Sequence, residues 1–160
     1  MKRLFILRHA DSIPGANDKM RPLSKEGRKE LKRLMAKEPG LFRDIDMVLC
    51  SSSTRTRETL EEVNGCLSDN TMVSYIDALY HASSEVILEE LRFVADNFNS
   101  VLVVAHNPGL TQFLHHVCEC HGQSMDKSMK TGSLAEFSVQ LESWHSLEYA
   151  DLKFIRMIRS

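Results

Sequence analysis

Arg8 and His9 are the first residues in this sequence that could do chemistry, because this basic pair directly follows an apolar run at residues 4–7. Positive charge at the end of a buried strand is unfavourable unless an anion meets it there. A neutral imidazole is also a nucleophile that can attack phosphorus. The pair therefore predicts that Arg8 holds an anionic substrate and that His9 reacts with it.

Two more basic residues follow apolar runs in the same way. Arg55 comes shortly after the run at 45–50, and His106 directly follows the unbroken β-branched run at 101–105. Two guanidinium groups match the oxygens of a phosphoryl group, and two imidazoles add ring nitrogens. The carboxyl ends of parallel strands meet at one edge of a sheet. The spacing thus predicts a phosphoryl site, without the cluster of carboxylates that would hold magnesium.

Hydrophobic periodicity predicts the elements that position these residues. Strands are expected at residues 4–7, 45–50, 72–76, 101–105, 135–141 and 152–158, the fifth of them with one exposed face. Helices are expected after Ser24, over 54–67, after Ser83 or Ser84 as far as Phe98, and from Asn107 and Pro108 onward. Gly27, in the first turn of the first helix, indicates close packing or the approach of a ligand. This alternation predicts an α/β fold, a three-layer αβα sandwich with a mainly parallel sheet, in one domain spanning 1–160.

The composition excludes several classes of protein. A formal net charge of -2 gives no basic field for nucleic acid. The longest apolar run is far too short to span a membrane, and Arg8 and Asp11 interrupt any signal-peptide core. The 4 cysteines show no regular spacing, which favours a reducing compartment. We therefore expect a cytoplasmic protein that binds neither nucleic acid nor membrane.

Five ordered segments of the chain resemble a known family. LRHAD, SSSTRTRET and VAHNPGL are similar to the three signature regions of the histidine phosphatase superfamily. RPLSKEG and TGSLAEF resemble its short branch, and the likeness to phosphohistidine phosphatases of SixA type covers essentially the whole chain. The resemblance implies a phosphoglycerate-mutase-like fold and a phosphatase that needs neither a metal nor another cofactor.

The same resemblance implies a role for each of the four basic residues. His9 corresponds to the nucleophile that accepts the phosphoryl group, and Arg8 and Arg55 correspond to the arginines that clamp it. His106 matches the second histidine, which is protonated and donates a hydrogen bond to the phosphoryl oxygens. A charge-assisted pocket of this kind stabilises the transferring group more than the free substrate.

The proton donor is the place where the chain departs from the family pattern. Larger members supply a glutamate after the third strand, but DALYHASSE offers no clear match, and Asp11 and His81 are the candidates nearest the motifs, ahead of Asp77 and Glu85. Ala10 stands where many relatives have glycine, as is common in the short branch. A phosphohistidine leaves as an imidazole and needs less help from an acid than an alkoxide does. The missing glutamate therefore favours phosphohistidine in a partner protein as the substrate.

Two alternative functions remain at this stage. The same chemistry could act on a small phosphate ester, a phosphorylated metabolite, instead of a protein. The chain could instead be a module that recognises phosphorylated proteins without turnover. The presence of all four residues, Arg8, His9, Arg55 and His106, speaks against such a module. The lack of long insertions that would roof the pocket favours a protein substrate over an enclosed metabolite.

A second cluster of potential ligands lies at residues 115–121, HHVCECH. Structural zinc sites draw pairs of ligands from two separated segments, and no second pair is evident. On a helix His115 and Cys118 would share a face, whereas Cys120 would not. We therefore interpret the segment as a cysteine-rich helix end and expect no metal there.

Overall fold

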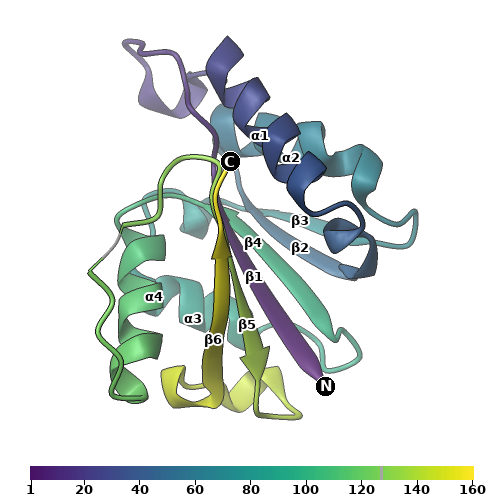
Figure 1. Cartoon of the computed structure of the whole chain (residues 1–160), viewed down its shortest axis with the longest axis vertical. Coiled ribbons are helices and arrows are strands. Elements are labelled where there is room, and N and C mark those ends of the chain that lie inside the picture. Colours follow the sequence, from purple (N-terminus) through teal and green to yellow (C-terminus); the bar gives the residue numbers. More distant parts are fainter. Residues whose placement is uncertain (127) are drawn as a thin grey trace.

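A six-stranded sheet in the order β3-β2-β4-β1-β5-β6 forms the centre of the protein in a computed structural model, which describes residues 1–126 and 128–160 (Figure 1). The strands are β1 (Lys2–Arg8), β2 (Met47–Ser51), β3 (Met72–Ile76), β4 (Ser100–Ala105), β5 (Leu134–Val139) and β6 (Leu152–Ile158). The first four are parallel, β5 pairs antiparallel with β1, and β6 pairs antiparallel with β5. The predicted mainly parallel sheet is therefore confirmed.

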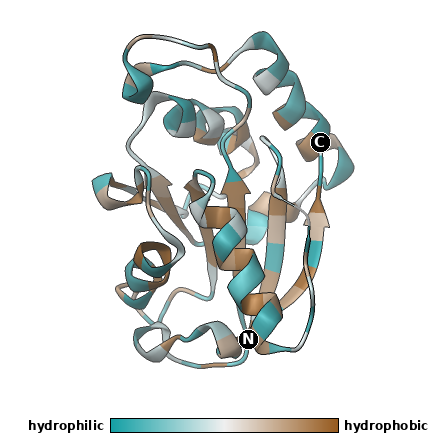
Figure 2. Ribbon diagram, turned by 90° about the vertical axis from the view of Figure 1, so that its left-hand side faces the viewer, coloured by the Kyte–Doolittle hydropathy of each residue, from teal (hydrophilic) through white to brown (hydrophobic). Residues whose placement is uncertain are grey.

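Four helices cover the two faces of the sheet. They are α1 (Lys25–Lys37), α2 (Thr54–Val63), α3 (Ser84–Arg92) and α4 (Gly109–Cys120). The apolar stripes of α1 and α2 pack with Phe5 and Leu7 on one face, and those of α3 and α4 pack with Leu4 and Ile6 on the other (Figure 1). Apolar strands between helices with polar outer faces are visible in Figure 2. The predicted three-layer αβα sandwich is thus confirmed.

The boundaries of several elements differ from the prediction. Ser24 caps α1 as expected, its Oγ accepting a hydrogen bond from the backbone N–H of Gly27 at 3.0 Å. The α-helix over 54–67 ends earlier and continues as a 3-10 turn, Asn64–Cys66. Similarly, α3 ends at Arg92, well before Phe98. The remaining 3-10 turns are Asp18–Met20, Leu41–Asp44, Asp77–Leu79, Trp144–Ser146 and Tyr149–Asp151.

The start of α4 lies one residue beyond the expected position. Pro108 is the cap residue and the helix begins at Gly109. Asn107 still serves the helix end, because its Oδ1 accepts hydrogen bonds from the backbone N–H and the hydroxyl of Thr111, at 3.2 and 2.9 Å. The side chain of Asn107 therefore accepts hydrogen bonds from the first turn of α4, although Asn107 lies one residue before the N-cap position.

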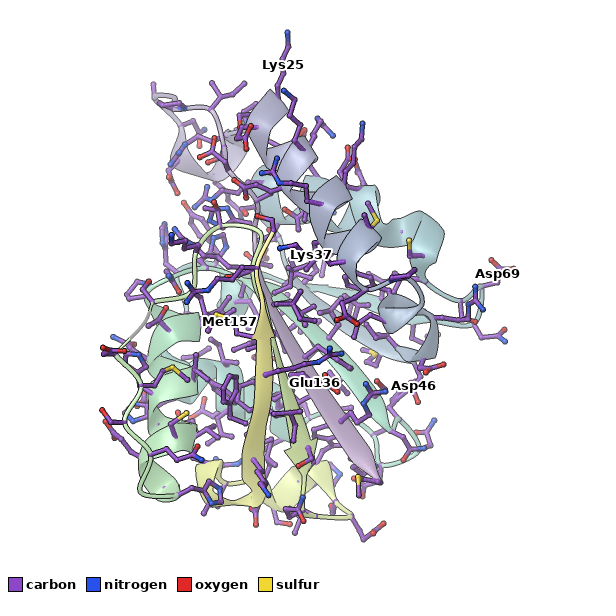
Figure 3. All side chains as sticks on the ribbon, in the orientation of Figure 1. Lys25, Lys37, Asp46, Asp69, Glu136 and Met157 are labelled. Atoms are coloured by element: carbon purple, nitrogen blue, oxygen red, sulfur yellow. The ribbon has the colours of Figure 1, made fainter. Side chains whose placement is uncertain are left out.

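The prediction that β5 has one exposed face is wrong for Glu136, which is 8% exposed. Its two carboxylate oxygens accept hydrogen bonds from Arg3 and Arg156, each at 2.8 Å. Figure 3 labels this glutamate among the strands at the centre of the view. Two ion pairs compensate the loss of water around the charge, so a carboxylate fits where the alternating pattern predicted solvent.

The order in which strands are added to the sheet reverses beside β1. The connections through α1 and α2 lead toward the β3 edge, and the connection through α3 returns the chain to β4, between β2 and β1. Ligands of such sheets bind at the carboxyl ends of strands near this reversal. At this end Arg8 of β1 is paired in register with Ala105 of β4. Among the described residues, no helix is long and apolar enough to cross a membrane.

Close packing at Gly27 leads to a test of stability. A Cβ atom on this residue would lie 2.2 Å from the carbonyl oxygen of Asp11, which is backbone and cannot move aside cheaply. We expect Gly27→Ala to lower the free energy of unfolding by about 2 kcal/mol or more, because overpacking forces backbone shifts. Gly65→Ala is the control, since nothing lies within 4 Å of its Cβ position. Urea unfolding measures both, and equal midpoints for the two variants would contradict the packing argument.

Candidate active site

The four basic residues predicted from the sequence come together at the carboxyl end of the parallel strands. Arg8 is the last residue of β1 and His9 follows it, while His106 follows β4 and Arg55 lies in the first turn of α2. The rings of His9 and His106 have their centroids 5.3 Å apart. His9, Arg55 and His106 are 8%, 4% and 3% exposed. The structure thus gathers two imidazoles and two guanidinium groups in a largely buried cluster at the carboxyl end of the strands, hereafter the pocket.

The ring of His9 is oriented by the backbone next to it. Its Nδ1 lies 2.8 Å from the carbonyl oxygen of Ala10. A carbonyl can only accept, so Nδ1 carries the proton and Nε2 keeps its lone pair in the neutral ring. Burial, and then the positive charges of Arg55 and Arg8, lower the pKa of His9 to about 4, against an opposing effect of the Ala10 carbonyl. At neutral pH His9 is therefore an uncharged imidazole with a defined tautomer and a free lone pair on Nε2.

His106 is held from one side only. Its Nε2 lies 2.7 Å from Oγ of Ser51, at the end of β2, and its buried Nδ1 has no hydrogen-bond partner among the described residues. Burial, with further effects of His9 and Arg55, lowers the pKa of His106 to about 3. The free pocket therefore favours the neutral ring. A bound anion would favour the protonated ring, because opposite charges nearby stabilise the ionised form.

The two arginines use backbone carbonyls as partners and retain donors for a ligand. Arg8 donates from Nη1 to the carbonyl of Met129 at 2.9 Å, and its buried Nε has no partner among the described residues. Arg55 donates from Nη1 to the carbonyl of Asp18 at 2.7 Å and from Nη2 to its carboxylate at 3.1 Å. A guanidinium group has five N–H donors. Each arginine therefore keeps donors for the oxygens of an anion.

Asp18 is a residue of the pocket that the sequence reading missed. It begins the 3-10 turn Asp18–Met20, and besides Arg55 its carboxylate accepts hydrogen bonds from the hydroxyl of Tyr80 at 2.5 Å and from Arg21 at 3.1 Å. The hydrogen bond from Tyr80 is the largest cause that holds the pKa of Asp18 far below its usual range. The sequence offers no signal that distinguishes Asp18 from the other polar residues of its loop.

The two residues predicted as candidate proton donors lie in different surroundings. His81 is beside the pocket: its Nε2 is 3.2 Å from Oδ2 of Asp18, and its ring centroid is 5.9 Å from that of His106. Asp11 instead accepts a hydrogen bond from the hydroxyl of Ser24 at 2.6 Å, at the start of α1. The structure therefore brings His81 to the four basic residues, whereas the described contacts of the Asp11 carboxylate lie outside the pocket.

The side chains of residues 115–121 diverge. Cys118 is buried in the core and Cys120 is exposed. His116 stacks near Tyr149 with ring centroids 5.1 Å apart, while Nε2 of His121 lies 2.7 Å from the carbonyl of Leu152. Within residues 1–126 and 128–160, no group of three or more His, Cys, Asp or Glu side chains is placed to hold a metal ion.

Comparison with known proteins points to one family. The chain is 35% identical to an uncharacterized protein of Mycobacterium tuberculosis over 108 residues, spanning 64% of this chain and 63% of that protein's length. It is 32% identical to the phosphohistidine phosphatase SixA of Escherichia coli over 120 residues, spanning 72% of this chain and 74% of SixA. A structure of the protein histidine phosphatase SixA complexed with tungstate superposes with a TM-score of 0.80, at 25% identity, covering 98% and 96% of the two chains. No family model matches the sequence.

The lowered pKa of His9 makes stability depend on pH. The pKa of His9 is about 4 in the folded protein, against an ordinary value of 6.5, so the unfolded chain binds more protons between these two pH values. The contribution of His9 to the free energy of unfolding is therefore present in full above about pH 6.5, and about 3 kcal/mol of it is lost as the pH drops toward 4. We expect His9→Gln to lack this component, so that its stability falls less steeply than that of the wild type. Urea unfolding at pH 7, 5.5 and 4.5 measures the difference, and parallel curves would refute it.

Proposed function

This chain belongs to the histidine phosphatase superfamily, in its SixA-like branch, and we propose that it removes the phosphoryl group from phosphohistidine in a partner protein. The observation that carries the proposal is the state of His9. Its Nδ1 is fixed on the Ala10 carbonyl, which leaves the Nε2 lone pair free, and burial together with the positive charges of Arg55 and Arg8 lowers its pKa to about 4. A neutral nucleophile in a pocket that attracts anions suits attack on a phosphoryl group.

The proposed reaction has two steps and needs neither a metal nor another cofactor. In the first, Nε2 of His9 attacks phosphorus, a new P–N bond forms, and the P–N bond to the substrate imidazole breaks. The departing nitrogen takes a proton from the pocket. In the second, water attacks phosphorus, a P–O bond forms and the P–N bond to Nε2 of His9 breaks. Inorganic phosphate leaves, His9 returns to the neutral imidazole, and a proton of the attacking water restores the group that protonated the leaving imidazole.

The other three basic residues would stabilise the transferring group. Arg8 and Arg55 offer their remaining N–H donors to its equatorial oxygens, where the charge is concentrated. His106 would donate from Nδ1, which has no partner in the described part of the chain, since Nε2 can accept from the hydroxyl of Ser51. Because these donors are already buried and held by the protein, they need little rearrangement when the charge develops.

For the proton of the leaving group we propose the pair formed by Asp18 and His81. In the free pocket Asp18 is ionised, held so by the hydrogen bonds from Tyr80, Arg21 and Arg55. A phosphoryl dianion on Arg55 would compete for that guanidinium and repel the carboxylate, and both effects raise the pKa of Asp18. The substrate itself would thus favour the protonated acid that the leaving imidazole requires.

A protein substrate is favoured by the surroundings of the pocket. The side chains of Asp18 and His81 are 43% and 58% exposed, so the pocket opens beside them to the surface. Ile13 and Met20, on the same loop as Asp18, are 48% and 67% exposed. Exposed apolar side chains around a polar site are suited to contact with another protein surface.

Replacement of His9 tests the nucleophile and the substrate class together. We expect His9→Ala to lower turnover of a phosphohistidine protein by at least about 1000-fold and to abolish the acid-labile phosphoenzyme seen after rapid quenching. His145→Ala, at an exposed position, is the control. With the wild type, kcat/KM for a phosphohistidine protein should exceed that for phosphoserine peptides and sugar phosphates. A higher value for a metabolite would overturn the protein-substrate proposal, and retained turnover in His9→Ala would overturn the nucleophile.

Asp18→Asn tests the proton donor. We expect kcat on a phosphohistidine protein to fall about 100-fold, because the amide cannot supply a proton to the imidazole. The loss should be much smaller on 4-nitrophenyl phosphate, whose leaving group needs no protonation. An equal loss on both substrates would mean that Asp18 only orients Arg55. Asp69→Asn, at an exposed aspartate, controls for the change of charge.

A further inference from the structure

Glu30 is a buried charged residue to which the proposed reaction gives no part. It lies on α1 and is 7% exposed, on the side of the helix that carries the buried residues Leu31 and Leu34. A carboxylate is rarely buried without a partner that compensates the loss of water. Its contacts therefore indicate what it does.

The carboxylate of Glu30 joins two segments that are far apart in the sequence. Oε1 accepts a hydrogen bond from the hydroxyl of Thr131 at 3.0 Å, and Oε2 lies 3.4 Å from the backbone N–H of Asp11. Gly132 packs directly against it, because a Cβ atom there would come within 2.6 Å of Oε2, and its φ of +69° also favours glycine. Glu30 thus lies between the end of β1 and the turn that precedes β5.

That turn, residues 129–133, is bonded to the pocket at several points. The backbone N–H of Gly132 is shared between the carbonyls of Arg8 and His9, at 3.2 and 3.1 Å. The carbonyl of Met129 accepts from Nη1 of Arg8 at 2.9 Å and from the side chain of Asn107 at 2.8 Å. The turn therefore connects the segment that carries the nucleophile to the segment that carries the second histidine.

We propose that Glu30 is a positioning residue, which fixes the 129–133 turn against β1 and thereby holds the guanidinium group of Arg8 in place for the phosphoryl group. The identity of the ligand, a phosphoryl group, rests on the proposed function. The positioning of Arg8 by the 129–133 turn does not depend on it. The negative charge of Glu30 also opposes the lowering of the Arg8 pKa that burial causes. Burial raises the pKa of Glu30 itself, so a neutral group of the same shape would fit the position.

Two substitutions separate position from charge. Glu30→Leu removes both hydrogen bonds and retains the apolar contacts of the helix. Glu30→Gln keeps an acceptor for Asp11, and its amide can donate to the hydroxyl of Thr131, which accepts as well as donates. Glu26→Leu is the control on the same helix, at a glutamate whose side chain is 57% exposed.

The experiment has one readout in the free protein and one with inorganic phosphate. NMR measures the exchange of the Arg8 Nε–H with solvent, which we expect to be slow in the wild type and in Glu30→Gln and at least about tenfold faster in Glu30→Leu. Calorimetry measures the affinity for phosphate. We expect this affinity to weaken about tenfold or more in Glu30→Leu, because a small displacement of a binding group costs at least this factor. In Glu30→Gln it should stay within about threefold of the wild type.

The outcomes distinguish this proposal from the proposed function. Unchanged exchange of the Arg8 Nε–H in a folded Glu30→Leu protein would overturn the positioning role, whatever the protein binds. Faster exchange with no phosphate binding in the wild type would support the role and count against the phosphatase. If Glu30→Leu does not fold, Thr131→Val removes only the hydroxyl at 3.0 Å from Oε1, and the same two readouts then decide.

Discussion

The burial of positive charge at the carboxyl end of β1 is the constraint on which the rest of the structure depends. Arg55 and both histidines are almost completely buried, and Arg8 is partly so. Cations removed from water need compensation. The protein supplies backbone carbonyls from Met129 and Asp18 and keeps the two imidazoles neutral by lowering their pKa. Within the residues that the structure describes, Nε of Arg8 and Nδ1 of His106 remain without a partner, and an oxyanion would satisfy them.

The architecture serves this constraint by bringing distant segments to one edge of the sheet. Adjacent parallel strands place Arg8 and Ala105 in register, so that His9 and His106 follow on neighbouring strands. The turn before β5 then closes over the end of β1. Because β5 is antiparallel to β1, it begins where β1 ends, and the 129–133 turn that leads into it therefore lies next to the pocket.

Protonation and anion binding are coupled in such a pocket. In the free protein the low pKa values of His9, His106 and Asp18 favour two neutral imidazoles and an ionised carboxylate. A phosphoryl dianion would raise the pKa of each by the same electrostatic effect. In the proposed reaction a higher pKa is useful at His106 and Asp18, because these groups would have to donate a hydrogen bond or a proton. At His9 the fixed tautomer keeps the lone pair of Nε2 available for attack.

The sequence by itself determined the sandwich, the parallel core and the convergence of Arg8, His9 and His106, because apolar periodicity and the ends of strands are local patterns. The choice of Arg55 over its neighbour Arg57 came from the resemblance to the family, since the local pattern of charge does not separate the two. It could not select Asp18 over Asp11, since the same type of side chain occurs twice in one loop and only the folded loop decides which carboxylate reaches Arg55. The contact of Arg8 with the Met129 carbonyl joins residues 121 positions apart, and that of Glu30 with Thr131 joins residues 101 positions apart. Such contacts depend on three-dimensional packing, which no local pattern of residues records.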